Sequence, residues 1–189
     1  MRGFGQIGLK GYRADKAAEE AAFFANKAGG EIEKLKLIKL IYLTERESMT
    51  VRARPMIYDE MYSLKHGPIC SNALNGINGE VDRPVWSKWV RIHGSKDVRL
   101  LREPSRAKLE HLSDSDLKLM ERVWTRFGHM TSAQIRKWTH DNCPEYTAVE
   151  DGRVPISYSE AFKSVGHEDA AELADDVVQY RRSEAALAS

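Results

Sequence analysis

Cysteine is scarce in this chain of 189 residues, which contains only Cys70 and Cys143. Two cysteines are too few for a disulfide framework, and the absence of a Cys-x-x-Cys spacing argues against a zinc site or a redox motif. We therefore expect a protein of a reducing cytoplasm that has no structural disulfide.

Long apolar runs are also missing. No stretch approaches the roughly 20 apolar residues that span a bilayer, and residues 1–10 hold three glycines and scattered apolar side chains rather than the apolar core of a signal peptide. The formal net charge is only +1, so the chain as a whole has no electrostatic preference for nucleic acid, acidic substrates or membranes. With 42% hydrophobic residues it has enough apolar side chains to close one core.

The small net charge hides an asymmetry along the chain. Residues 1–109 carry 20 Lys and Arg against 13 Asp and Glu, whereas residues 110–189 carry 9 against 15. Basic and acidic helix faces directed to solvent on one domain account for this most simply. The alternative is that each half suits a different partner, with the acidic half imitating the phosphates of a nucleic acid toward a basic toxin.

Helical periodicity dominates the chain. The apolar spacing and the capping residues predict helices over residues 13–27, 32–48, 59–65, 71–77, 116–127, 131–140, 158–165 and 168–181. The helix at 32–48 is apolar on most of its circumference, which indicates a central, buried position. The His-Gly-Pro sequence at 66–68 is typical of a helix end.

One segment has a period of two instead. Residues 85–102 alternate on both sides of Gly94-Ser95-Lys96-Asp97, which predicts a β-hairpin. We therefore expect an α+β fold that is predominantly helical: a flexible lead-in at 1–12, a single domain at 13–182 and a frayed tail at 183–189.

Three segments follow one another in a recognisable order. They are KLKLIKLIYL at residues 34–43, YSLKHGPI at 62–69, and Thr-His followed by Cys-Pro within 139–144. Their order and spacing resemble those of the Panacea family of antitoxins, also called SocA-like or GepA-like proteins. The resemblance extends over about residues 17–166, which is most of the chain.

This resemblance implies a function that the residues alone do not declare. It implies a bacterial or phage antitoxin that binds and neutralises a toxin encoded nearby, and one relative acts as an adaptor that delivers its toxin to a protease. It brings no catalytic residues, cofactor or metal. The expected partners are thus a cognate protein toxin, with a protease or a second copy of the chain as further candidates.

Aromatic and basic side chains provide candidate partner contacts, because such residues dominate the energy of binding surfaces. Trp86 and Trp89 lie three apart, so on a strand they point to opposite faces and at most one belongs to the core. The outward one would act with Arg91. On a helix, Tyr62 and His66 stack on one face, either as a buried hydrogen-bonded pair or as the wall of a toxin-binding groove.

Two other segments suggest different classes of function. Residues 116–140 imitate a helix-turn-helix whose second helix carries Gln134, Arg136 and Lys137, but the negative charge of this half opposes binding to phosphates. The crowding of His140, Asp141 and Cys143 suggests an activated thiolate, but an ordinary helix end, with His140 interacting with the last carbonyls, explains it better. Zinc bound by His140, Cys143 and a distant Cys70 or His66 has less support. We expect no enzyme and no specific binding of nucleic acid.

Overall fold

The computed structural model describes residues 11–187 and confirms the predominantly helical α+β class. The lead-in expected at 1–12 and the tail expected at 183–189 lie partly outside these residues. The elements, in chain order, are α1 Ala14–Lys27, β1 Glu31–Glu33, α2 Lys34–Arg52, β2 Met61–Leu64, β3 Gly67–Cys70, α3 Ser71–Ile77, α4 Arg83–Trp86, β4 Val90–His93, β5 Asp97–Leu100, a 3-10 turn Arg106–Lys108, α5 Asp114–Phe127, α6 Ser132–Asn142, β6 Val154–Ile156, α7 Tyr158–Ser164 and α8 Ala170–Leu187.

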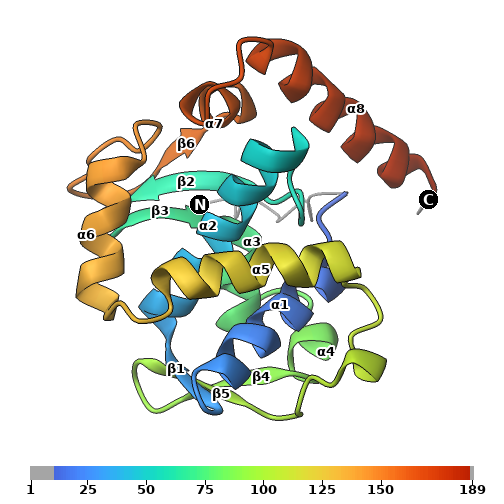
Figure 1. Cartoon of the computed structure of the whole chain (residues 1–189), viewed down its shortest axis with the longest axis vertical. Coiled ribbons are helices and arrows are strands. Elements are labelled where there is room, and N and C mark those ends of the chain that lie inside the picture. The colour runs from blue at the N-terminus through green and yellow to red at the C-terminus, as the bar shows by residue number, and fades with distance from the viewer. Residues whose placement is uncertain (1–10, 188–189) are drawn as a thin grey trace, which may run out of the picture.

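Helix α2 forms the centre of the molecule, as the breadth of its apolar surface predicts. It packs against α1, α5, α6 and α7 and against strand β3 (Figure 1). Its residues from Leu37 to Glu45 are all buried. Most of the helix is therefore surrounded by protein rather than by water.

Two small antiparallel sheets lie at separate places around this centre (Figure 1). One has the order β1-β5-β4, and it contains the predicted hairpin, with His93 paired to Asp97. The other has the order β3-β2-β6 and was not predicted. Its strand β6 comes from the loop that follows α6, so this sheet ties together segments far apart in the chain.

The helix predicted at 59–65 is wrong. Its residues form β2, which makes a hairpin with β3 through the two-residue turn Lys65-His66. Gly67 has a φ of +96° that favours glycine, and Pro68 is tolerated because β3 is an edge strand. The Gly-Pro pair therefore starts a strand rather than ending a helix, and Tyr62 and His66 do not stack on a helix face.

Helices α5 and α6 each begin with a capping box. Ser113 and Asp116 form a capping box, and Thr131 and Gln134 form another. Helix α3 begins where it was expected, but its cap comes from a distance: the Asp59 carboxylate accepts hydrogen bonds from the backbone nitrogens of residues 72 and 73. Long-range capping of this kind leaves no local pattern in the sequence.

Asp116 also joins three helices. It forms ion pairs with Lys16 of α1, at 2.9 Å, and with Arg52 of α2, at 2.6 Å. Burial alone would raise the pKa of Asp116, but the hydrogen bonds from Lys16 and Arg52 outweigh it and hold the pKa well below its usual range. The carboxylate is thus ionised wherever the protein is folded near neutral pH.

Trp86 and Trp89 are both buried, with exposed fractions of 2% and 5%, so the prediction that one of them points outward is wrong. The reason is that residues 83–86 form α4 and the strand begins only at Val90, so the two-residue period does not apply. Trp86 packs on Gly76, where an added Cβ would lie 2.1 Å from the indole ring. Both indoles belong to the core.

Several carboxyl groups are also buried in the core. Glu20 has no exposed surface and neither of its oxygens has a hydrogen-bond partner among the described residues. Glu45 accepts hydrogen bonds from the backbone nitrogens of Met56 and Ile57, at 2.7 and 2.8 Å. Burial raises the pKa of Glu45 to about 7 and that of Asp59 to about 6. The core is therefore most stable when these groups are protonated.

This burial predicts a pH dependence of the free energy of unfolding. Between about pH 4.3, where Glu ionises in the unfolded chain, and pH 7, the folded state holds more protons, so stability falls as pH rises. Glu45→Gln keeps the acceptor oxygen and removes the ionisation. From pH 5 to pH 8, the free energy of unfolding of Glu45→Gln should fall by on the order of 2 kcal/mol less than that of the wild type, measured by urea unfolding. Parallel curves for the two proteins would contradict the assignment.

Because Trp86 is buried, shortening its side chain should destabilise the fold. Trp86→Ala should reduce the free energy of unfolding by about 3–5 kcal/mol, because it removes a large buried ring and leaves a cavity. Arg91→Ala, at an exposed position of the adjacent strand, should change it by less than about 0.5 kcal/mol. Circular dichroism during thermal unfolding distinguishes the two, and a stable Trp86→Ala protein would show that the indole is not core.

Candidate functional site

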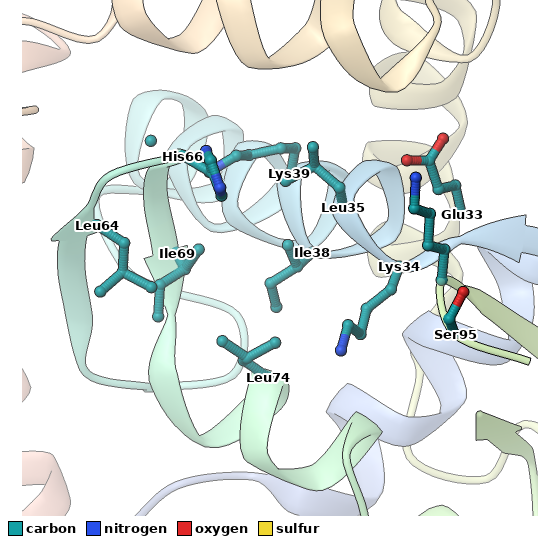
Figure 2. A pocket seen from close by; sticks show the side chains of 12 residues that line it. Glu33, Lys34, Leu35, Ile38, Lys39, Leu64, His66, Ile69, Leu74 and Ser95 are labelled. Atoms are coloured by element: carbon teal, nitrogen blue, oxygen red, sulfur yellow. The ribbon is translucent and has the colours of Figure 1, made fainter. Parts of the chain in front are cut away.

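A groove of about 410 Å³ opens beside the first turns of α2. It lies between α2, the β2–β3 hairpin, α3 and the turn that joins β4 to β5 (Figure 2). The side chains that line it are Glu33, Lys34, Leu35, Ile38, Lys39, Leu64, His66, Ile69, Leu74, Ser95 and Lys96. Its volume falls within the range of ligand and side-chain binding sites.

Aliphatic side chains form the middle of the groove and basic side chains lie toward its ends. In Figure 2, Ile38 lies between Lys34 and His66, and Ile69 and Leu74 lie below His66. This arrangement follows from α2: residues 35 and 38 are one helical turn apart and share a face, and residues 34 and 39 flank that face. The lining therefore combines an apolar surface with positive charge.

Lys39 is the least usual member of the lining. The residue has no exposed surface, and its Nζ donates a 2.7 Å hydrogen bond to the backbone oxygen of Pro68 in β3. Burial lowers the pKa of Lys39 to about 7, a shift that the nearby thiols of Cys143 and Cys70 oppose only in part. At neutral pH a proton can thus be added to or removed from this amine at little cost.

His140, on α6, lies close to Lys39 and Gly67. Its Nε2 atom is buried and makes no hydrogen bond of good geometry within residues 11–187, and its ring lies 4.5 Å from that of Tyr146. Burial, then the charges of Arg136 and Lys39, lower the pKa of His140, and a contact with the backbone of His66 and the charge of Asp141 oppose this in part. A Cβ built on Gly67 would approach the Lys39 Nζ at 2.9 Å and the His140 Nε2 at 3.0 Å. Glycine at 67 thus keeps both nitrogens uncrowded.

These features belong to a segment that a family model recognises. The model described as "Antitoxin SocA-like, Panacea domain" matches residues 37–147, more than half of the chain. The chain belongs to this family. No curated protein and no solved structure matches it.

The matched part of the Panacea domain contains most of the groove. It includes Lys39 and Ile38 of α2, the whole β2–β3 hairpin, α3 and the β4–β5 turn. Helices α7 and α8 follow the matched region, and Figure 1 shows α8 lying along the outside of the molecule. The groove is thus built mainly by the part that defines the family.

The predicted partner-binding residues of the Panacea domain are scattered. His66 lines the groove and is exposed. Tyr62 is partly buried on β2, where the Arg153 guanidinium lies 4.5 Å from its ring centroid, and Arg91 is exposed on β4. Trp86 and Trp89 are core residues and offer no surface to a partner. Of the five, the structure brings only His66 to the groove.

Sequence reasoning missed Lys39 and considered His140 only for catalysis or zinc. The sequence did contain a signal for Lys39. The apolar residues around it cover all sides of the helix, so a helix buried by these residues also buries the lysine. The pairing of Lys39 with β3 depends on a sheet that was not predicted.

The residues weighed for enzymatic chemistry lack the expected activation. Burial raises the pKa of the Cys143 thiol to about 12 and raises that of Cys70 as well, so both thiols are protonated at neutral pH. Within the part of the chain that the structure describes, no group of three His, Cys, Asp or Glu residues is placed to hold a metal ion. In the same part, no helix combines the length and apolarity needed to cross a membrane.

Burial of Lys39 predicts a second pH dependence, in a different window from that of Glu45. Between pH 7 and about pH 10.4, where lysine titrates in the unfolded chain, the unfolded state holds more protons, so stability rises with pH. Lys39→Met removes the titrating amine and with it this rise in stability. We expect it to stabilise the protein by roughly 1–3 kcal/mol at pH 6 and by less at pH 9, measured by urea unfolding. An equal effect at both pH values would show that Lys39 does not titrate in this window.

Proposed function

We propose that this protein is the antitoxin of a toxin–antitoxin pair and neutralises its toxin by direct binding in the cytoplasm. The observation that carries the proposal is membership of the SocA-like, Panacea antitoxin family. Binding would either cover the active site of the toxin or hold the toxin in an inactive conformation. The protein acts stoichiometrically in this scheme and turns over no substrate.

The groove beside α2 is our candidate for the toxin contact. Interfaces concentrate their binding energy where apolar anchors enter a well-formed pocket with a polar rim. The groove has this composition, with leucine and isoleucine side chains in the middle and lysines toward its ends. The exposed turn residues Lys65 and His66 and the exposed Ser95 and Lys96 extend the same surface outward.

Specific DNA binding has less support. Two of the side chains that would read base edges are already engaged: the Gln134 side chain accepts a hydrogen bond from the backbone nitrogen of Thr131, and Lys137 forms an ion pair with Asp141 at 2.7 Å. The third, Arg136, is partly buried. No observation favours a protease-adaptor role or a homodimer over simple occlusion.

A growth assay tests the proposal. The neighbouring open reading frame is expressed alone and then together with this chain, and the tagged pair is purified. We expect toxicity that this chain relieves and a stable complex. A harmless neighbour with no co-purifying protein would contradict the antitoxin function.

The location of the contact predicts a pair of matched variants. Leu74→Glu places a charge in the apolar middle of the groove and should reduce toxin affinity by about tenfold or more, with loss of neutralisation. Leu101→Glu introduces the same change at a leucine that is 42% exposed and lies outside this groove. It should leave growth rescue intact.

Both variants are first checked by thermal unfolding, since each position is at least partly exposed and the melting temperature should change by only a few degrees. Full rescue by a folded Leu74→Glu protein would move the toxin contact away from the groove. Loss of rescue by Leu101→Glu would show that the toxin contact lies near β5.

A further inference from the structure

We propose that the groove binds an acidic segment of the toxin, with an Asp or Glu carboxylate placed at the corner formed by Lys39, His66 and His140 and an aliphatic side chain on the apolar middle. This inference rests on the proposed function, because it takes the toxin as the occupant. It adds the chemistry of the contact, which family membership does not supply.

Lys39 has no counter-ion among the described residues. Its Nζ has three possible hydrogens to donate and uses one, on Pro68. No carboxylate forms an ion pair with it among residues 11–187, and the groups that affect its charge are two thiols and the cation of Arg136. A buried ammonium without a partner destabilises a protein, so a site that retains one is suited to an anion that arrives from outside.

The place where Lys39, His66 and His140 meet also favours a carboxylate. The His140 Nε2 is buried without a hydrogen bond of good geometry, although the backbone of His66 contacts this ring, and the lack of a side chain at Gly67 lets this atom and the Lys39 Nζ lie close to the same stretch of backbone. Two nitrogens that can both donate when protonated converge on one place. A carboxylate, which accepts hydrogen bonds through two oxygens, matches two such donors.

The charges along the rest of the groove also complement an acidic segment. Glu33 is the only carboxylate among the described residues that line it, and this group already accepts a 2.5 Å hydrogen bond from Ser132. Lys34 lies away from His66 in Figure 2, and its backbone nitrogen donates to the backbone oxygen of Lys96, which also lines the groove. Positive groups at both ends favour a segment with more than one acidic residue, which a single chain terminus does not provide.

His66 controls access to the corner. In Figure 2 the Lys39 side chain extends toward His66, which is exposed and sits on the turn between β2 and β3. Lys39 itself has no exposed surface. A ligand therefore reaches the amine by displacing the His66 side chain, which moves a turn residue and leaves the core in place.

Binding of a carboxylate at this corner also stabilises the charged form of Lys39, so it draws a proton onto the amine above pH 7. The titratable and charged groups that face this amine are His66 from the β2–β3 turn, Arg136 and His140 from α6, Cys143 after it, and Cys70 from β3. The thiols stay protonated, and burial together with the cations lowers the pKa of His140. The pKa of Lys39, about 7, means that this amine loses its charge between pH 7 and pH 8.5.

The first test uses small probes and needs no toxin. The full-length chain, labelled with nitrogen-15, is titrated with 4-methylpentanoate and, in parallel, with neutral 4-methylpentanamide, which has the same aliphatic group. We expect the carboxylate to shift the amide signals of Gly67 and Ile69 and to bind at least about tenfold more tightly than the amide. Its affinity should fall at least about threefold from pH 7 to pH 8.5.

Lys39→Met should weaken carboxylate binding about tenfold and abolish its pH dependence, and this protein is expected to fold at least as stably as the wild type. Lys36→Met is the matched control, because Lys36 is on the same helix but donates to the backbone of Gly128, outside the groove. Equal binding of the acid and the amide, no binding of either, or unchanged binding by Lys39→Met would each overturn the carboxylate site.

The second test uses the toxin identified by the growth assay. Lys39→Met should bind it at least about tenfold more weakly than Lys36→Met does. Full neutralisation by Lys39→Met would overturn the toxin as occupant while leaving the antitoxin function standing. A chain that binds the carboxylate probe but has no toxic neighbour would instead refute the antitoxin function together with the assigned occupant.

Discussion

The burial of helix α2 is the constraint on which the rest of the structure depends. Residues 37–45 of this helix are all buried, so every polar side chain in that stretch must find its partner inside the protein. Lys39 bonds the backbone of β3, Glu45 bonds the backbone at residues 56 and 57, and the Tyr42 hydroxyl donates to Glu145. The central helix thereby fixes the irregular segments around it.

The same constraint places the groove. The hairpin that forms one wall is held to α2 by the bond from Lys39 to Pro68, while the backbone of Lys34 donates to Lys96 in the turn at the other end. Both walls are thus attached to a single rigid helix, which gives the pocket a defined shape before any partner arrives. A preformed surface beside a buried lysine that has no carboxylate partner among the described residues suits a protein that acts by binding.

The sequence predicts the parts of this fold that depend on local pattern. Helical periodicity and capping boxes locate α1, α5 and α6 closely, and the apolar run at 34–43 identifies the central helix. The β3-β2-β6 sheet was missed because β6 joins it from about 90 residues away and because Gly67 and Pro68 imitate a helix end. Four of the five predicted partner residues lie outside the groove. Tyr62 was placed on a helix that is in fact β2, and Trp86 and Trp89 were placed on a strand although residues 83–86 form α4.

Hydrogen–deuterium exchange of the protein, alone and bound to the product of the neighbouring gene, tests the central claim that the groove is the binding surface. The account predicts slower exchange in the complex at the β2–β3 turn, in α3 and at the β4–β5 turn, which together wall the groove. Slower exchange confined to α5, α7 and α8, with the groove walls unchanged, would contradict it.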